Sequence, residues 1–318
     1  MLKYIIKRLL ITIPVFLLIT FFVFMLTDMV PGSPVDILAE SGDLTPEAYR
    51  ELEHALGLDR PMPVRYFSWL SDILHGNMGI SNRTKQPVST MIGERIGPSL
   101  LLTMSGLLLA VLISIPLGTL SAYKPYSIWD NLSTGISFIG ASAPGFFLCL
   151  LAIYFFSVRL GWLPSSGMYT VRGDRTFIDL LRHLIMPASI VGLQLTGSLI
   201  KQTRGSVLEV MNEEYIKTAR SKGIGERLVV IKHALRNALI PIVTQIIIQV
   251  PFLVGGSVAV EKIFGWPGLG SLMVTSITNR DYNAILGIAV IICIAVLAAN
   301  ILLDIVYSYL DPRISIED

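Results

Sequence analysis

Long apolar stretches alternate with charged stretches along this chain. Six intervals contain no Lys, Arg, Asp or Glu, and each approaches or exceeds the roughly 20 residues that a helix needs to cross a bilayer. They are residues 9–27, 96–123, 131–158, 184–200, 237–260 and 282–303. The pattern predicts an all-α membrane protein with six transmembrane helices. The interval 184–200 is the shortest, and we expect its helix to gain a turn at either end.

The first apolar interval admits two interpretations. It follows Lys3, Lys7 and Arg8, as the hydrophobic part of a signal peptide would. However, the sequence DMVPGSP at residues 28–34 lacks the small-x-small pattern of a cleavage site, and the apolar run is long for a signal peptide. We therefore interpret it as a retained first span.

Basic residues in the short loops indicate the orientation of the chain. With six spans, both termini lie on one side of the membrane. Lys3, Lys7, Arg8 and Lys124 fall in short segments on that side, together with the basic residues between positions 201 and 236. Because short loops rich in Lys and Arg stay in the cytoplasm, the pattern predicts that both termini are cytoplasmic.

The longest polar segment, residues 31–95, is predicted to form a small helical cap outside the membrane. Thr45, followed by proline and glutamate, is an N-cap pattern, and Gly57 is positioned to end the helix. Two further short helices are expected at residues 63–75 and 87–95. Three roles stay open for this cap: gating a pore, docking a partner, or covering the outer ends of the spans.

A charged segment, residues 201–241, separates the fourth and fifth spans. Within it, Asn212 is positioned to cap a helix of about ten residues that has acidic residues in its first turn, basic residues in its last turn and Gly223 as a left-handed stop. A second amphipathic segment follows at residues 226–236. Its apolar residues are expected to share one face; they are Leu228, Ile231 and Leu235. Such a compact cytoplasmic helix is predicted to contact a partner.

Composition agrees with a membrane environment. The chain has 318 residues, of which 53% are hydrophobic and 15% charged, and its mean hydropathy is +0.65. A soluble protein of this size has a higher proportion of charged residues and a lower mean hydropathy. The net charge of +2 gives no general attraction to nucleic acid. Cys149 and Cys293 both fall inside apolar intervals, where we expect core or lipid-facing thiols and no disulfide.

Uncharged polar side chains distinguish the interior of the spans. No interval has an ionisable residue in its interior, so the proton or sodium relay of an ion-coupled carrier is not predicted. Amide and hydroxyl groups in lipid need partners, so these side chains either bond neighbouring helices or line a watery path. The candidates for lining a path are Ser137, Ser142, Gln194, Ser198, Gln245 and Gln249.

The sequence contains no recognisable catalytic or metal-binding motif. There is no phosphate-binding GxxxxGK[ST] loop, no HExxH pair and no cysteine cluster. His54 and His75 lie far apart without further ligands nearby, so neither is expected to bind a metal. We therefore predict no catalytic residue, no metal site and no ATPase activity in this chain. Uphill transport would need energy from a separate protein that acts on the segment 201–241.

Short motifs spread over nearly the whole chain resemble those of a known family. In order, they are YIIKRLLITIPVFLLIT from residue 4, PGSP from 31, LGLDRPMPVRYFSWL from 56, GNMGIS from 76, APGFF from 143, LPSSG from 163, EYIKTARSKG from 214, HALRNALIP from 233, EKIFGWPGLG from 261, RDY from 280 and LDPRI from 310. Each motif alone is weak, but their combined order is specific. The chain resembles the inner-membrane permease subunit of binding-protein-dependent ABC importers, in the oligopeptide, dipeptide and nickel branch.

The resemblance implies a type I ABC importer permease fold in which residues 215–223 form the coupling helix. The family pattern there is EAA, three residues and then Gly. Ala219 and Gly223 fit this pattern, whereas Lys217 and Thr218 stand where Glu and Ala are usual. The residues that the resemblance implies in coupling to an ATPase are Glu214, Tyr215, Thr218, Ala219, Arg220, Lys222, Gly223 and Pro241.

The resemblance also implies partners and a location. The partners are a second homologous permease subunit, two ATP-binding subunits that bind ATP and Mg, and an extracytoplasmic solute-binding protein; this chain itself is expected to hold no cofactor and to bind no nucleic acid. The location is the inner or plasma membrane of a bacterial or archaeal cell, among membrane lipid. Peptides are the first expectation for the cargo, and nickel or a nickel chelate is the alternative.

The chain is accordingly divided into four parts. Residues 1–30 are the cytoplasmic N-terminus and first span, 31–95 the cap, 96–310 the permease core with the coupling segment 201–241, and 311–318 a cytoplasmic tail. Two other classes stay open. A stand-alone channel or secondary carrier would transport without any ATPase, and a membrane sensor or scaffold would bind a ligand at the cap without moving cargo.

Overall fold

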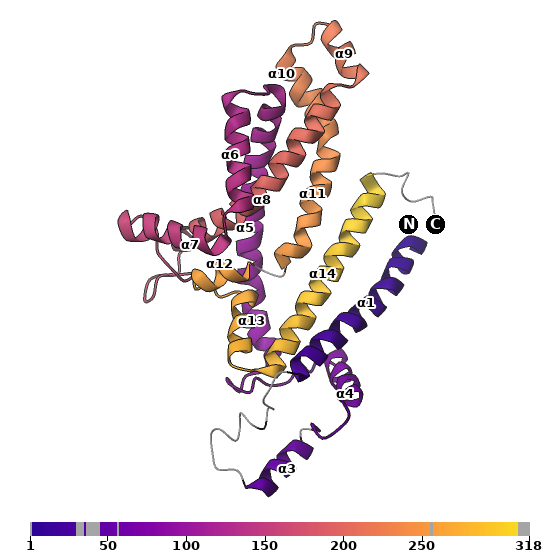
Figure 1. The fold of residues 1–318 in the computed structure, drawn as a ribbon, viewed down its shortest axis with the longest axis vertical. Helices are drawn as coiled ribbons and strands as arrows, with labels where there is room; N and C mark the ends of the chain where they lie inside the picture. Colours follow the sequence, from indigo (N-terminus) through magenta and orange to yellow (C-terminus); the bar gives the residue numbers. More distant parts are fainter. Residues whose placement is uncertain (1, 30–34, 36–44, 56, 255–256, 311–318) are drawn as a thin grey trace.

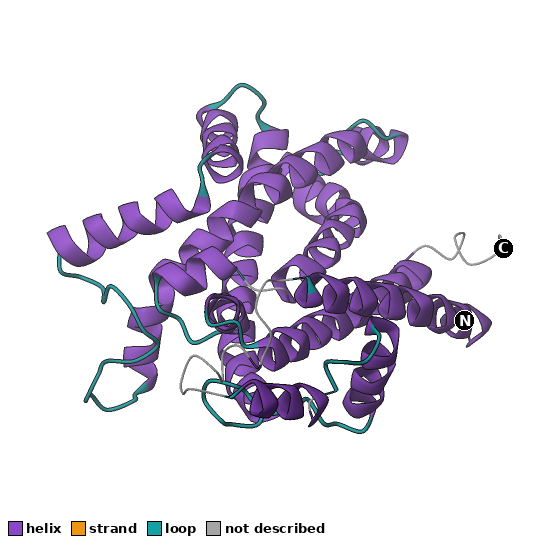
Figure 2. Cartoon of the chain, turned by 60° about the horizontal axis from the view of Figure 1, so that its bottom comes forward, coloured by secondary structure: helices purple, strands orange, loops and turns teal. Residues whose placement is uncertain are grey.

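The computed structural model describes residues 2–29, 35, 45–55, 57–254 and 257–310. Within these ranges the regular structure is helical, as Figure 2 shows, and the only strand-like feature is an isolated bridge between Ile80 and Pro87. The helices are α1 (Leu2–Asp28), α3 (Pro46–Ala55), α4 (Met62–Leu74), α5 (Val88–Tyr123), α6 (Ile128–Ser142), α7 (Gly145–Ala152), η1 (Ile153–Arg159), α8 (Phe177–Met211), α9 (Glu214–Ser221), α10 (Glu226–Leu228), η2 (Val229–Leu235), α11 (Arg236–Val254), α12 (Val258–Ile263), α13 (Leu269–Thr278) and α14 (Tyr282–Leu310).

Five described helical stretches are long and apolar enough to cross a membrane, and a sixth is added if one bent pair is counted as a span. This confirms the predicted all-α class with about six spans. The bent pair replaces the single helix expected over 131–158. Its two parts, α6 and the α7–η1 segment, meet at 108°, because Pro144 has no N–H to donate and holds Ala143 in an extended conformation.

Two other predicted boundaries differ from the structure. The fourth helix was expected to gain a turn at either end of residues 184–200; α8 is a 35-residue helix and extends beyond this interval at both ends by more than one turn. The separate helix expected at 87–95 is the first part of α5. Val88 and Ile92 are buried against α13 and α14, and this packing keeps the segment helical and continuous with the second span.

The described part of the outer segment packs against the first span. Thr45 Oγ accepts a hydrogen bond from the N–H of Ala48, so α3 begins directly after the predicted N-cap residue. Gly57 has φ +65°, as expected of a glycine that follows the end of a helix. In α4, Tyr66 is buried against α1 and its hydroxyl donates to the carbonyl of Leu17 at 3.0 Å. Residues 31–34, 36–44 and 56 of the predicted outer segment lie outside the described residues.

Helices α5, α6 and α8 pack closely against one another. A Cβ on Gly118 of α5 would lie 2.6 Å from the Cβ of Thr203 on α8, and one on Gly197 of α8 would lie 2.8 Å from the carbonyl oxygen of Ser137 on α6. The backbones can approach this closely only because glycine has no side chain, as is usual between transmembrane helices. Helix α11 contacts both α8 and α14, and α14 contacts α1.

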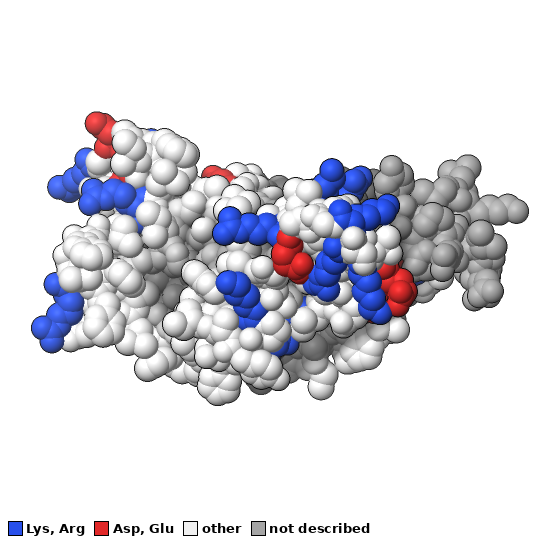
Figure 3. Space-filling view, turned by 90° about the horizontal axis from the view of Figure 1, so that it is seen from above, with Lys and Arg blue, Asp and Glu red and all other residues white. Residues whose placement is uncertain are grey.

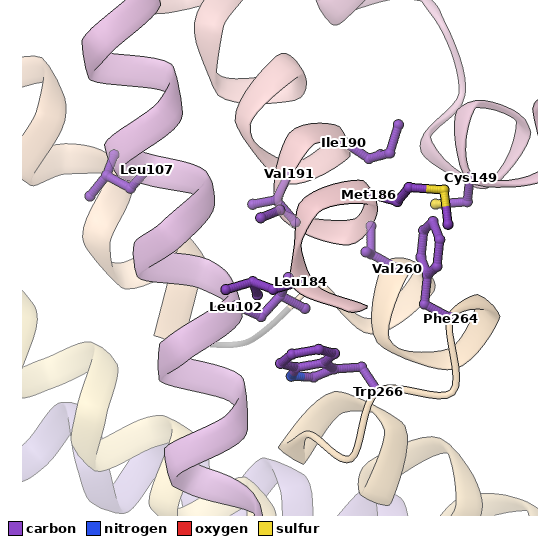
Figure 4. Close-up of a cluster of buried hydrophobic side chains, with 11 residues drawn as sticks. Leu102, Leu107, Cys149, Leu184, Met186, Ile190, Val191, Val260, Phe264 and Trp266 are labelled. Carbon is purple, nitrogen blue, oxygen red and sulfur yellow. The ribbon is translucent and has the colours of Figure 1, made fainter. Parts of the chain in front are cut away.

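The main apolar core joins this helix group to the short helix α12. Figure 4 shows Trp266 and Phe264 pointing toward side chains of α5 and α8. The indole N–H of Trp266 donates to the carbonyl of Pro98 at 2.9 Å. Beside it, the buried carboxylate of Glu261 accepts hydrogen bonds from Ser99 Oγ at 2.6 Å and from the N–H of Ser271 at 2.9 Å. These contacts fix the α12–α13 turn on α5.

The two thiols lie where the sequence pattern places them. Cys149 belongs to the core around Trp266, Cys293 is buried in α14, and neither forms a disulfide.

Figure 1 shows that α9 and the α3–α4 pair lie at opposite ends of the long axis of the molecule. The long helices run between these two ends, so any partner at α9 is separated from α3 by the full span of the membrane helices.

Candidate coupling site and transport face

The exposed helix at the upper end in Figure 1 is α9. It begins at Glu214, and the prediction that Asn212 caps it is wrong: Asn212 ends α8, and its side-chain amide donates to the carbonyl of Leu208 at 3.0 Å. The residue that caps α9 is Glu213, whose side chain makes no capping hydrogen bond. Helix α8 therefore continues almost directly into α9.

The C-terminal end of α9 has the predicted glycine stop. Gly223 has φ +76°, its N–H donates to the carbonyl of Arg220 at 2.9 Å, and the N–H of Ile224 donates to that of Ala219 at 3.4 Å. This pair of bonds is a Schellman motif, which needs a left-handed residue after the helix. Ile224 also packs against the cluster that contains Ala219. The helix thus ends at a fixed position and orientation.

One face of α9 is anchored and the other is exposed. Ile216 and Ala219 are buried against Val229 and Ala234 of η2 and against the end of α8. The exposed residues of the predicted coupling set are Glu214, Tyr215, Thr218, Arg220, Lys222 and Gly223. A force applied to the exposed face would reach α8 and η2 through these packed side chains, because close-packed interiors transmit strain.

Ion pairs and hydrogen bonds hold α9 in place. Arg220 Nη2 lies 2.7 Å from Glu226 Oε1 across the Gly223 turn, and this bond to Glu226 raises the pKa of Arg220. The amide of Asn237 on α11 donates to the hydroxyl of Tyr215 at 2.8 Å. Seen from this end of the molecule, Lys and Arg side chains gather with acidic side chains between them (Figure 3). Pro241, the last residue of the predicted set, is half-buried inside α11.

The segment after Gly223 follows a different register from the predicted one. Leu228 and Ile231 are 52% and 65% exposed, so the expected apolar face of residues 226–236 is wrong. The cause is η2, a π-helix, in which residues five apart share a face. Val229 and Ala234 have this spacing, and both are buried in the cluster that contains Ile216 and Ala219.

Some of the side chains predicted to line a path lie where α8 and α11 meet. The side-chain amide of Gln249 donates to Ser198 Oγ at 3.0 Å. Gln194 is exposed one turn from Ser198, and a Cβ on Gly145 would touch its amide nitrogen. Gln245 is half-buried one turn before Gln249. The structure thus gathers these side chains along α8 and α11, beside the break between α6 and α7.

The two predicted serines of α6 lie in different surroundings. Ser142 is exposed at the end of the helix. Ser137 is 2% exposed, and its hydroxyl has no hydrogen-bond partner; its backbone lies against Gly197 of α8. In this conformation Ser137 contributes to helix packing and offers no surface to a path.

A charged cluster near α9 was not predicted from the sequence. Arg204 of α8 donates through Nε to Asp130 Oδ1 of α6 at 2.9 Å and to Ser121 Oγ of α5 at 3.0 Å. Asp130 and Arg204 lie just outside predicted spans, where charges are common, and they are 74 positions apart. The available signal was local: Ser127 and Asp130 have the spacing of a helix-capping pair, and Ser127 Oγ accepts the N–H of Asp130 at 3.4 Å.

The arrangement defines a multi-pass helical membrane protein with a packed, exposed helix at one end and uncharged polar side chains between its spans. The family model described as "Binding-protein-dependent transport system inner membrane component" matches residues 114–316, more than half of the chain. The N-terminal model of the same membrane components matches residues 1–102. The chain belongs to this family, and it is an inner-membrane permease component of a binding-protein-dependent ABC importer.

Curated relatives align over the full length of the chain. A putative peptide permease protein of Brucella suis is 41% identical over 99% of this chain and 100% of its own length. The oligopeptide transport system permease protein AppB of Bacillus subtilis is 41% identical over 99% of each chain. The dipeptide transport system permease protein DppB of Escherichia coli is 35% identical, again over 99% of each chain.

Proposed function

We propose that this permease component imports peptides, which an extracytoplasmic solute-binding protein delivers to its outer end. The observation that supports this proposal most is the full-length similarity to relatives named for peptides, oligopeptides and dipeptides. The uncharged polar side chains between α8 and α11 suit a peptide, because amide and hydroxyl groups can bond peptide groups without holding an ion. The relatives reported above are not named for nickel, and nothing in the described helices favours a metal cargo.

The energy for import comes, in this proposal, from two ATP-binding subunits that bind ATP and Mg and contact α9. A second homologous permease subunit completes the pathway, and this chain itself hydrolyses nothing. Support comes from the shape of α9, which exposes one face while Ile216 and Ala219 anchor the other. Closure of the ATP-binding pair would shift α9, and the attached spans would open the pathway alternately to each side.

The orientation that this proposal requires has both termini and α9 in the cytoplasm, with α3 and α4 outside. The position of α9 opposite α3 and α4 along the long axis suits this orientation (Figure 1). So do the Lys and Arg side chains gathered at the α9 end, since basic segments stay in the cytoplasm. Helices α3 and α4 would then stand at the outer end, where the solute-binding protein delivers its cargo.

The test is reconstitution of the assembled complex in liposomes. With ATP inside and the cognate solute-binding protein outside, a radiolabelled alanine tripeptide should accumulate in the lumen and should stimulate ATP hydrolysis. Omitting the ATP-binding subunits should abolish accumulation. Full uptake without these subunits would instead identify a stand-alone channel or carrier, and uptake of Ni²⁺ with no peptide uptake would reassign the cargo.

A further inference from the structure

Three side chains connect the α9 ends of α5, α6 and α8, and we call them the cytoplasmic clamp: Ser121, Asp130 and Arg204. Asp130 is 7% exposed and Ser121 is fully buried. Arg204 contacts both carboxylate oxygens of Asp130, through Nε at 2.9 Å and through Nη2 at 3.3 Å. A two-point contact of this kind fixes direction as well as distance, because the guanidinium and the carboxylate are both planar.

The carboxylate of Asp130 is saturated by donors from three segments. Besides the two bonds from Arg204, it accepts the hydroxyl of Ser121 and, at 2.9 Å, the N–H of Tyr126. Tyr126 lies in the α5–α6 turn with φ +63°, a conformation that a residue with a side chain holds only when its surroundings impose it. The clamp therefore sets the shape of this turn as well as the distance between helices.

The clamp lies on the direct route from α9 into the membrane. Arg204 is two turns before Met211, the last residue of α8, and Met211 packs against the buried face of α9. On its other side, α8 is joined to α11 by the uncharged bond between Ser198 and Gln249. Among these described contacts, the clamp is the charged connection from the coupling end of α8 to α5 and α6.

The clamp holds the half of α6 that lies near α9. The close backbone contact of α6 with α8 lies at Ser137 and Gly140, in the half of α6 remote from α9. The half near α9 is tied to its neighbours by Asp130 and by Ser133, whose hydroxyl donates to the carbonyl of Leu117 at 3.2 Å. Glycine packing between α5 and α8 does not depend on Asp130, so the helix group can form without the clamp.

We propose that Asp130 and Arg204 are positioning residues, through which a displacement of α9 moves α5 and α6 together with α8. This inference rests on the proposed function, since it assumes that ATP-binding partners act on α9. Without the clamp, α8 would still move with α9, but the near half of α6 would lag behind. ATP would then be hydrolysed without a matching change at the pathway.

The test measures ATP hydrolysed per alanine tripeptide imported, in liposomes containing the assembled complex. Values are normalised to intact complex, so that a loss of folding cannot imitate a loss of coupling. For Asp130→Asn and Arg204→Gln we expect this ratio to rise at least about 5-fold, the lower end of typical coupling effects. Arg204→Lys keeps the charge but loses the two-point contact, so it should fall between wild type and Arg204→Gln.

Two further variants make the result decisive. Ser121→Ala removes one hydroxyl from the clamp without introducing a charge and should raise the ratio less than Asp130→Asn. Asp304→Asn removes a different ion pair, the 3.2 Å contact between Asp304 and Arg8 that joins α14 to α1, and should leave the ratio at the wild-type value. A wild-type ratio in Asp130→Asn and Arg204→Gln, or an equal rise in Asp304→Asn, would overturn the assignment.

A parallel variant separates this inference from the proposed function. Gly223→Val alters the end of α9 itself and leaves the clamp intact. If Gly223→Val raises the ratio and the clamp variants do not, the clamp proposal fails while coupling through α9 stands. If neither Gly223→Val nor the clamp variants change it, coupling through α9 fails, and the clamp proposal fails with it.

Discussion

Gly223 determines where and how α9 ends. Its φ of +76° lies in a region that costs residues with a Cβ about 1–2 kcal/mol, and β-branched residues more. We expect Gly223→Val to distort the Schellman turn, weaken the contact between Ile224 and Ala219 and reduce peptide uptake per ATP hydrolysed. Uptake and ATPase assays on the same liposomes measure both quantities.

Gly225 provides the matched control for this prediction. It lies two residues later, has φ −58°, and a Cβ there would meet no atom within 4 Å. Gly225→Ala should therefore leave the ratio of uptake to ATP hydrolysis at its wild-type value. Equal effects of the two substitutions would show that the left-handed turn has no special role.

Single residues also show which features the sequence could reveal. Gly223 was predicted correctly because the stop depends on a glycine and its immediate neighbours. Asn212 was not, because the competing option, continuation of α8 up to Met211, depends on packing that the local pattern does not contain. The pairing of Arg204 with Asp130 joins positions 74 residues apart, and each residue alone looks like an ordinary charge at the edge of a span.

Among the helices, α8 makes the closest contacts, and two of its glycines allow a direct test. A Cβ on Gly197 would lie 2.8 Å from the carbonyl oxygen of Ser137, whereas one on Gly205 would meet no atom within 4 Å. Gly197→Ala should therefore destabilise the protein by about 1–3 kcal/mol through overpacking. Gly205→Ala should stabilise it by about 0.5–1 kcal/mol through helix propensity.

The measurement is thermal unfolding of the purified complex in detergent. Gly197→Ala should lower Tm, and Gly205→Ala should raise it slightly. Both variants add the same methyl group to the same helix, so the two sites differ in their proximity to α6. A Tm for Gly197→Ala equal to that of Gly205→Ala would contradict the close α6–α8 packing.

Charge-free apolar intervals predict some of the helices and miss the boundaries of others. Spans such as α5 and α14 follow from long charge-free intervals. The break at Pro144 interrupts an interval that is apolar on both sides, so counting apolar residues joined α6 to α7, although the sequence Ala-Pro-Gly is a recognised breaker signal. The π-helix η2 has no comparable signal, since its register follows from the burial of Val229 and Ala234.

For the molecule as a whole, the proposed orientation predicts opposite labelling of its two ends. Glu51 of α3 and Lys222 after α9 are both exposed, and the two native cysteines are buried. In intact cells, or in spheroplasts where an outer membrane is present, a membrane-impermeant maleimide should label Glu51→Cys. It should label Lys222→Cys only after the inner membrane is opened. The reverse pattern would invert the proposed topology.

In the proposed function, α9 receives work from ATP-hydrolysing partners. The most direct measurement places a photocrosslinking amino acid at Thr218, on the exposed face of α9, in the complex assembled in its native membrane. Coupling through α9 predicts a covalent adduct with an ATP-binding subunit, with a yield that changes when ATP is added. An adduct only with lipid or with an extracytoplasmic component would contradict it.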